Sequence, residues 1–368
     1  MKILIVSSFV NFDVSKDVTA GGDQHLLILA REWVKNGNKI VNIPQKVHFD
    51  FRSIFIDSLK AIFTRANRYF LQDGLHNPDT IVSATPYPPD LIRAVKIGRL
   101  TGVRIHAYFH HITPSLFWKP FQRGFFRTIL NRLYITLALS MCKINGVHIF
   151  LDQPNEYKLG SITVHKDDDA IEDYVLEEII MGKKEVNNPN ERDIDIFFIG
   201  RVSKNKGVLN IVKALKRLNS EGTLLNTVIA GPIYDRRYYD RIIKYTIKNE
   251  LSSQIKFIGK ISDRDKIHCF SHSRMFVFPS YEEGWALAVM EAAACRVPIV
   301  AFSLEAYSYL HGNYFVSEAN PKSLAEAIKK CINDKELSTR LVENAYGLVT
   351  SYKYSKIANE HLQFFGED

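Results

Sequence analysis

Residues 279–298 read PSYEEGWALAVMEAAACRVP, and this stretch decides the fold. An apolar run precedes it, Gly284 provides a turn, and the residues that follow are apolar on nearly every side. This pattern is typical of a strand that turns sharply into a buried helix. Strand and helix in this order form the repeating unit of a parallel sheet covered by helices. We therefore expect an α/β fold.

Two series of alternating strands and helices lie on either side of a polar stretch at residues 182–193, which has turn formers and no apolar periodicity. The first series predicts strands at 2–9, 39–44, 80–85, 103–110 and 147–152, and helices near 23–36, 54–72, 89–101 and 117–142. The second predicts strands at 194–199, 227–230, 255–258, 275–279 and 298–302, and helices near 206–220, 238–249, 263–271, 286–294 and 321–333. The sequence thus predicts two Rossmann-like, doubly wound parallel-sheet domains that face each other across a cleft. Their predicted bounds are residues 1–185, joined by a closing helix at 352–368, and residues 186–351.

Length and composition indicate a globular protein. The chain has 368 residues, of which 46% are hydrophobic, and no apolar run approaches the ~18 residues that a membrane span needs. The first residues lead directly into a strand pattern without a signal-peptide cleavage region. The four cysteines are widely separated and lack the spacing of a zinc site or a disulfide framework. We therefore expect a cytoplasmic location.

The positive charge is concentrated in the N-terminal half. Residues 1–143 carry 19 Lys or Arg against 9 Asp or Glu, and no acidic residue lies between Asp90 and Asp152. Within this window, aromatic and apolar residues alternate with basic ones over residues 116–133. Such a helix can lie on an anionic membrane surface, while an ordinary packed helix with solvated arginines is the alternative. We expect no nucleic-acid partner.

A group of cations follows the predicted strand at 194–199. Residues 200–207 read GRVSKNKG and precede an amphipathic helix. The positive end of a helix dipole disfavours cations there by up to ~1 kcal/mol, so a bound anion such as a diphosphate would remove the conflict. The alternative is that Lys204 and Lys206 are solvated loop lysines.

Two glutamates flank the predicted turn at Gly284. Glu291 is the only charged residue from Gly284 to Cys295, and burial of a carboxylate is costly unless hydrogen-bond donors surround it. The hydroxyls of a bound ribose are one set of donors, and solvent or a structural arginine is the alternative. Glu283 lies eight residues upstream, up to ~12 Å away along a helix, which is too far for an acid/base pair acting on one bond.

These motifs resemble those of the retaining nucleotide-sugar glycosyltransferases of family 4, which have the GT-B fold. The resemblance is carried by Arg201 with Lys206, by the two glutamates around the sequence EGWAL, and by Gly21 and Gly22 before the first helix. It implies that Arg201 and Lys206 hold the donor diphosphate. It also implies that Glu283 contacts the donor sugar, that Glu291 binds the ribose, and that backbone amides contact the donor at Gly22, Gly284, Trp285, Ala286 and Leu287.

The family also places a functional histidine after a strand of the N-terminal, acceptor-side domain. His110 is the predicted residue, and the adjacent His111 leaves the register open. Two features depart from the family pattern: Arg296 replaces a usual glycine, and the loop after Phe302 lacks the common paired glycines. Sugar and acceptor preference therefore cannot be transferred from the family.

The predicted activity is transfer of a hexose-type sugar, with retention, from a UDP- or GDP-linked donor to a glycan or lipid-linked acceptor at the cytoplasmic membrane face. The nucleotide-sugar serves as co-substrate, and neither a metal nor another cofactor is expected, because cations and helix N-termini can stabilise the departing diphosphate. Two alternatives are a nucleotide-sugar epimerase on the same fold and a non-catalytic basic adaptor for membranes or nucleic acid.

Overall fold

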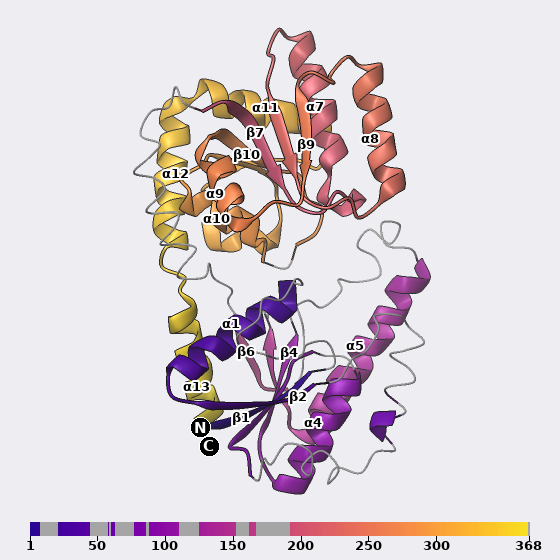
Figure 1. The fold of residues 1–368 in the computed structure, drawn as a ribbon, viewed down its shortest axis with the longest axis vertical. Coiled ribbons are helices and arrows are strands. Elements are labelled where there is room, and N and C mark those ends of the chain that lie inside the picture. The colour runs from indigo at the N-terminus through magenta and orange to yellow at the C-terminus, as the bar shows by residue number, and fades with distance from the viewer. Residues whose placement is uncertain are drawn as a thin grey trace. The chain divides into compact units, whose positions relative to one another are not determined.

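The computed structural model describes residues 1–7, 21–44, 58, 60–62, 77–85, 88–109, 125–151, 162–166, 192–283 and 285–366. The chain divides into two compact units (Figure 1). Unit 1 comprises residues 1–169 and 354–368, and unit 2 comprises residues 170–353. Each unit is built around one six-stranded sheet in which every described strand pair is parallel.

Unit 1 has the strand order β2-β1-β3-β4-β5-β6. The bounds of its strands are β1 Lys2–Ser7, β2 Lys39–Pro44, β3 Thr80–Ser83, β4 Ile105–Phe109, β5 His148–Leu151 and β6 Val164–Lys166. Five of these strands were predicted. The sixth, β6, has three residues and lies at the sheet edge, so it is too short to show the period-two alternation that marks a strand.

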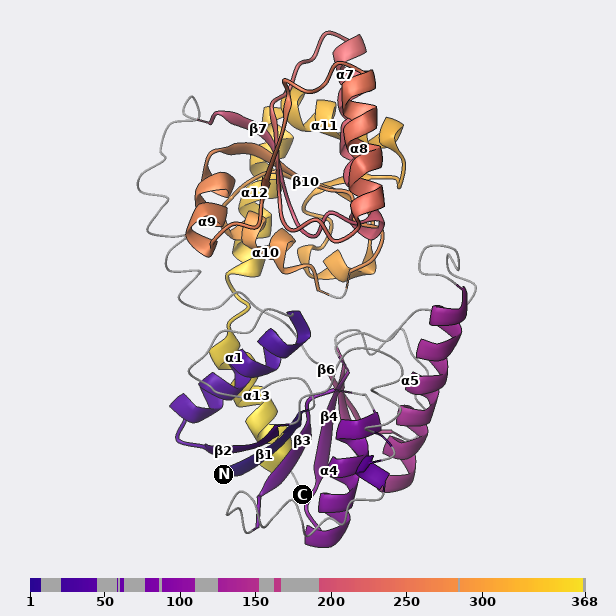
Figure 2. The ribbon, with the colours of Figure 1, turned by 45° about the vertical axis from the view of Figure 1, so that its right-hand side comes forward.

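Helices cover both faces of this sheet, as the two views in Figure 1 and Figure 2 show. One face carries α4 (Pro88–Thr101) and α5 (Phe125–Asn145), and the other carries α1 (Gly21–Lys35) and α13 (Tyr354–Gly366). The prediction placed Gly21 and Gly22 before the first helix, but the structure places both in the first turn of α1.

The segment predicted as a closing helix forms α13 and packs on α1 within unit 1. Trp33 of α1 is fully buried, and its Nε1 donates to the carbonyl oxygen of Ala358 at 3.2 Å. The His25 ring is 3.1 Å from the Tyr354 hydroxyl, and Tyr108 of β4 contacts His361 at 2.8 Å. A buried aromatic anchor and three polar contacts thus fix α13 to the sheet and to α1.

Unit 2 has the strand order β12-β11-β10-β7-β8-β9. Its strands are β7 Ile194–Ile199, β8 Thr227–Ala230, β9 Ile255–Gly259, β10 Ser273–Phe278, β11 Ile299–Phe302 and β12 Phe315–Ser317. The five predicted strands are present, and the three-residue edge strand β12 was not foreseen. The two sheets and their helices confirm the predicted doubly wound α/β fold.

Six helices accompany the sheet in the described part of unit 2. They are α7 Val208–Ser220, α8 Arg236–Lys248, α9 Asp263–Ser271, α10 Leu287–Ala294, α11 Pro321–Asn333 and α12 Lys335–Val349. Oxygen side chains cap four of them, Asp235, Ser262, Asn320 and Asp334, each accepting from a backbone N–H of the first turn. The sequence prediction missed α12, whose Asp334 cap directly follows the end of α11.

The structure shows how Arg296 is accommodated at the position where the family that the sequence resembles usually has glycine. It follows the C-terminus of α10 with φ of 50°, a left-handed conformation that favours glycine. Its guanidinium lies 3.9 Å from the centroid of the Tyr346 ring, and Nε is 3.3 Å from a carboxylate oxygen of Glu343. Both partners belong to α12, so contacts with that helix offset the backbone cost of a side chain at this position.

Candidate active site

The candidate site of unit 2 lies where the chain reverses its direction of winding. From β7 the chain proceeds to β8 and β9 on one side, and β10, β11 and β12 lie on the other. Ligands of open α/β sheets bind outside the carboxyl ends of the strands at such a switch point. The loops that leave β7 and β10, residues 200–207 and 279–286, are therefore the segments that sheet topology assigns to a ligand.

These two loops are joined by backbone contacts. Gly207 has φ of 69°, and a Cβ at this position would lie 1.9 Å from the carbonyl oxygen of Pro279. The amide of Tyr281 donates to the carbonyl oxygen of Asn205 at 2.8 Å. The Tyr281 hydroxyl accepts from the Asn210 side chain of α7 at 2.9 Å. Only glycine fits at Gly207, and its absence of a side chain brings the two loops together.

The most direct link between the loops is an ion pair. Lys206 Nζ lies 2.5 and 2.6 Å from the two carboxylate oxygens of Glu283. The side chains are only 14% and 9% exposed, so solvent screens this pair less than a surface pair. The Lys206 ammonium is also 5.4 Å from the centroid of the Phe278 ring. Two residues that were singled out separately in the sequence are therefore direct partners.

This pair changes the interpretation of the cation group in residues 200–207. The sequence suggested a group without acids, but Glu283 neutralises Lys206 from the neighbouring loop. Lys204 is exposed, and Arg201 is exposed with its guanidinium 5.1 Å from the Tyr234 ring centroid. No carboxylate is paired with Arg201 among the described residues. Arg201 is therefore the cation of this loop best placed to attract an anion.

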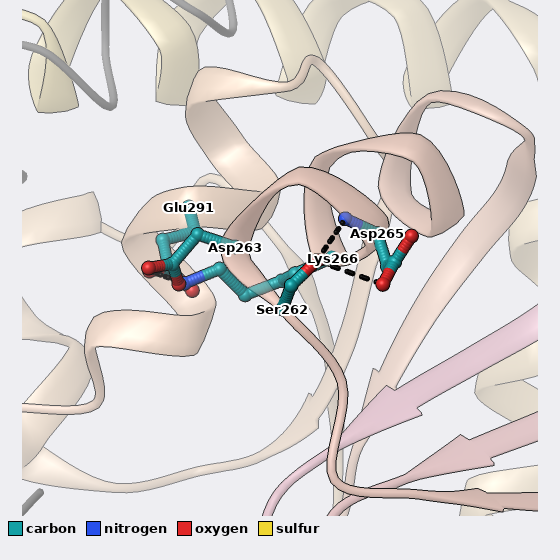
Figure 3. A network of polar contacts seen from close by, with 5 residues as sticks. All are labelled: Ser262, Asp263, Asp265, Lys266 and Glu291. Atoms are coloured by element: carbon teal, nitrogen blue, oxygen red, sulfur yellow. Dashed lines mark hydrogen bonds and ion pairs between the residues drawn. The ribbon is translucent and has the colours of Figure 1, made fainter.

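Glu291 lies one helical turn inside α10 and is held by a lysine that the sequence interpretation did not include. Lys266 Nζ is 2.7 Å from Glu291 Oε1 and 2.8 Å from Asp263 Oδ1 (Figure 3). The Glu291 and Lys266 side chains are 15% and 14% exposed. Sequence reasoning had named solvent or an arginine as the alternative partner of Glu291, and the structure supplies a lysine from α9.

The α9 N-terminus explains how Lys266 is positioned. Ser262 caps the helix: its Oγ accepts from the amide of Asp265 at 3.1 Å and donates to Asp265 Oδ2 at 2.7 Å (Figure 3). Acidic residues suit a first helical turn, whereas a lysine there opposes the helix dipole. Burial opposes the charge of Lys266, but Glu291 and Asp263 outweigh burial and raise the pKa of Lys266 above its ordinary value.

The N-terminus of α10 is where the sequence predicted backbone contacts with the donor. Its N-cap residue, Ala286, has φ of 60° and no side-chain oxygen, and no side-chain cap was found for this helix in the described part of the chain. Leu287 begins the helix, so its amide lies at the positive end of the dipole. By contrast, the amide of Leu209 in the first turn of α7 already donates to the Tyr238 hydroxyl at 2.9 Å.

Trp285 anchors the turn before α10 through its side chain. The indole stacks on Tyr309 with ring centroids 5.0 Å apart, and it meets Tyr352 edge-on at 5.8 Å. Its Nε1 lies 2.7 Å from Met290 Sδ. The side chain is thus committed to packing, and a contact between Trp285 and a ligand would have to come from the backbone.

Tyr307 was missed by the sequence interpretation. It lies in the 3-10 helix η4 (Glu305–Leu310), within the segment where the family glycines are absent. Its hydroxyl is buried and has no hydrogen-bond partner among the described residues. Burial raises the pKa of Tyr307 well above its ordinary value, and the charge of Glu283 adds to this effect. A buried, unsatisfied hydroxyl near Glu283 is a candidate sugar contact.

Several predicted residues lie outside the described part of the chain. They are His110, His111, Gly284 and the first residues of the basic aromatic stretch, 116–124. Gly22 lies in the first turn of α1. The described candidate site therefore consists of Arg201, Lys206, Glu283, Glu291 and the backbone around Leu287, with Lys266 and Tyr307 as additions.

Residues 182–348 match the family described as "Glycosyl transferases group 1". This matched stretch contains both loops and both ion pairs. The match lies within unit 2 and leaves all of unit 1 outside it.

Curated relatives share modest identity with part of the chain. "Capsular polysaccharide biosynthesis glycosyltransferase CapM" of Staphylococcus aureus is 25% identical over 173 residues, which cover 46% of this chain and 44% of CapM. A Campylobacter jejuni N,N'-diacetylbacillosaminyl-diphospho-undecaprenol alpha-1,3-N-acetylgalactosaminyltransferase is 30% identical over 118 residues, or 31% of each protein. The chain spans under half the length of these relatives. The names of these relatives are those of glycosyltransferases, the enzyme class that the sequence predicted.

Solved structures with the GT-B fold resemble the whole chain. Anabaena Alr3699/HepE in complex with UDP and glucose matches with a TM-score of 0.70 at 14% identity, covering 100% of both chains. Sucrose-phosphate synthase of Thermosynechococcus elongatus matches with a TM-score of 0.73 at 15% identity, covering 99% of this chain and 98% of that one. These matches show the GT-B fold, as the sequence predicted.

Two further observations concern the environment of the protein. Across the described residues, no helix combines the length and the apolar character that crossing a bilayer requires. All four cysteines are buried.

Proposed function

We propose that this protein is a retaining, metal-independent glycosyltransferase of family 4 that moves a hexose-type sugar from a UDP- or GDP-linked donor to a glycan or lipid-linked acceptor. The observation that carries the proposal is the Lys206–Glu283 ion pair, which lies at the switch point between β7 and β10 inside the matched domain. Relatives named for UDP complexes and for an undecaprenol-linked acceptor support the classes of donor and acceptor.

The chemistry that this site must provide is stabilisation of negative charge on the departing diphosphate. In our proposal the donor diphosphate separates Lys206 from Glu283 and takes the ammonium for itself, while Glu283 turns to the sugar hydroxyls. Arg201, which is exposed, and the uncapped N-terminus of α10 at Leu287 add positive charge and amide donors. Fixed donors aimed at developing charge lower the barrier to bond cleavage.

Glu291 is proposed to bind the ribose of the nucleotide. Its carboxylate is held in place by Lys266, which in turn is held by Asp263. A carboxylate fixed by a neighbouring ammonium stays ionised and oriented, which suits hydrogen bonds from two vicinal hydroxyls. Lys266 is therefore proposed as a positioning residue for Glu291.

We also propose that the protein works at a membrane surface, where a lipid-linked acceptor would be found. The support in the described residues is an apolar stripe on α5, where Leu133, Leu137 and Ile144 are 62, 53 and 76% exposed. These positions share one helix face, and exposed Lys143 lies beside the stripe. An apolar stripe beside basic residues is typical of helices that lie on anionic bilayers.

The central experiment is a screen of UDP- and GDP-sugars in thermal-shift and transfer assays with undecaprenyl-diphosphate-linked acceptors. We expect a donor to raise Tm and to be consumed only when acceptor is present, and we expect the product to keep the donor's anomeric configuration by NMR. Donor conversion without acceptor would favour the epimerase, and absence of nucleotide-sugar binding would favour the non-catalytic adaptor. An inverted product would contradict retention.

The membrane proposal has its own test in co-sedimentation with anionic vesicles at low salt. We expect wild type to sediment, and we expect Leu133→Ser with Leu137→Ser to sediment less while keeping donor binding. The matched control is Leu224→Ser, which changes an exposed leucine of unit 2. Equal sedimentation of all three proteins, or of none, would contradict a membrane role for this stripe.

A further inference from the structure

Three histidines lie on one face of the unit 1 sheet. His106 belongs to β4, His148 to β5 and His165 to β6, which are adjacent strands in the sheet. His106 is the register partner of His148. Successive side chains of a strand alternate between faces, and the neighbours of His106, Ile105 and Ala107, belong to the core on the opposite face. The three imidazoles therefore project together.

The three rings lie close enough to share one ion. One ring nitrogen from each residue can be chosen such that all three lie within 4.8 Å of one another. Nδ1 of His148 and Nε2 of His165 are 3.2 Å apart. Two nitrogens bound to a tetrahedral zinc ion at ~2.0–2.1 Å lie about 3.3 Å apart, so this pair already has the spacing of two ligands.

His106 supplies a second, independent observation. It is fully buried, and neither ring nitrogen has a hydrogen-bond partner among the described residues. Leaving a buried polar group without a partner is unfavourable, and a metal ion bound at either nitrogen would relieve part of this cost. An unsatisfied imidazole beside two others is what a ligand-free metal site would contain.

The protonation state of His106 also suits a metal ligand. Burial, followed by the nearby His148, His165, Arg104 and His361, lowers the pKa of His106 to about 3. The ring is therefore neutral at physiological pH, which is the form that binds metals. The charge of Arg104 also opposes a bound cation, so the three nitrogen bonds must outweigh that repulsion.

We propose that His106, His148 and His165 bind a divalent transition metal of the zinc class, with water in the fourth coordination position. Imidazole suits zinc, copper and nickel, and three histidines with one water is a known zinc arrangement. The proposed ion would join β4, β5 and β6 beneath the end of α13, where Phe365 packs on His106 at 4.7 Å and Phe364 stacks on His165 at 4.2 Å. Its role would be structural, separate from sugar transfer.

The experiment uses the full chain, stripped of metal with a chelator and then titrated with Zn²⁺ against a chromogenic competitor and, separately, with Co²⁺. We expect one ion per chain and the intense visible absorption of tetrahedral Co²⁺. His165→Gln should weaken Zn²⁺ binding by more than about 100-fold, because loss even of an outer-shell partner costs about 10- to 100-fold. His148→Ala should do the same, and Zn²⁺ should raise the Tm of wild type but of neither variant.

The matched control is a second pair of histidines. His268 and His272 lie on one side of the α9 C-terminus with ring centroids 3.9 Å apart, a spacing that can also bind metals. We expect His272→Ala to leave Zn²⁺ affinity and the Co²⁺ spectrum unchanged. Absence of binding in wild type, an octahedral Co²⁺ spectrum, or binding that survives His165→Gln and His148→Ala would overturn the proposal. Thermal unfolding of the metal-free variants establishes that each is folded.

Discussion

Two lysine–glutamate pairs bracket the start of α10, and they differ in what surrounds them. Lys206 contacts both carboxylate oxygens of Glu283, whereas Lys266 contacts two carboxylates, those of Glu291 and of the mostly exposed Asp263. The first pair joins the two loops at the sheet switch point, and the second joins two helices. A pair without a third charge can be exchanged for a ligand, whereas a shared pair holds its carboxylate in place. We therefore expect the first pair to open during catalysis and the second to persist.

The largest effect is expected from Lys206→Ala. Loss of one donor to the developing diphosphate charge should lower kcat/KM by about 100- to 1000-fold while the fold stays intact. The control is Lys204→Ala, because Lys204 is an exposed lysine of the same loop. Steady-state kinetics should place that control within about 3-fold of wild type, as is usual for an exposed side chain without specific contacts. Wild-type turnover in Lys206→Ala would refute the assignment of the first pair to catalysis.

Glu291→Ala should have the next largest effect and act on the other pair. A hydrogen bond to a charged group is worth about 1.5–3 kcal/mol, so loss of the ribose contact should lower kcat/KM by about 10- to 100-fold. Isothermal titration with the free nucleoside diphosphate should show the same loss. Unchanged nucleotide affinity, with only a lower free energy of unfolding, would mean that Glu291 serves packing alone.

Lys266→Met tests whether Lys266 holds the Glu291 carboxylate in place. The quantity measured is the pH dependence of the free energy of unfolding. The pKa of Lys266 is raised above 10.5 in the folded state, so its contribution is present in full below the unfolded-state pKa. It is lost as the pH rises through the folded-state pKa. Urea unfolding between neutral and strongly alkaline pH should therefore show a steeper loss of stability for wild type than for Lys266→Met. Parallel profiles would contradict a supporting role.

The smallest effect is expected at the far end of α10, from Arg296→Gly. Glycine removes the backbone cost of about 1–2 kcal/mol at φ of 50°, and loss of the contact with Tyr346 forfeits about 0.5–1 kcal/mol. Because these terms oppose each other, we expect the free energy of unfolding to change by less than about 1 kcal/mol and kcat/KM to stay unchanged. A large loss of activity would show that both pairs depend on the C-terminal end of this helix.

The fold could be predicted from the sequence largely because parallel strands buried on both faces read as short apolar runs. β7 and β10, for example, were recognised in this way. The edge strands β6 and β12 were not, because three residues are too few for a periodic pattern. The missed α12 begins directly after α11, and Asp334 alone separates the two helices. Because no loop sequence lies between them, the sequence did not indicate a second helix.

The candidate site was only partly predictable. Lys206 and Glu283 stood out locally, but their pairing depends on the adjacency of β7 and β10, which residue spacing does not reveal. Lys266 gave no local signal, since a lysine in a first helical turn is common on a solvated face. Tyr307 could have been suspected from the missing family glycines, because replacing small residues with bulky ones changes what fills that space.

The last described helix, α13, has a consequence for biosynthesis. During translation, residues 170–353 leave the ribosome before α13 does, so unit 2 can fold while the sheet of unit 1 still lacks the helix that covers Trp33. Synthesis of unit 1 begins before that of unit 2 and is completed after it. Until α13 emerges, the apolar surface around Trp33 is open to chaperones, and a ribosome stalled before residue 354 would hold a nascent chain with unit 2 folded and unit 1 incomplete.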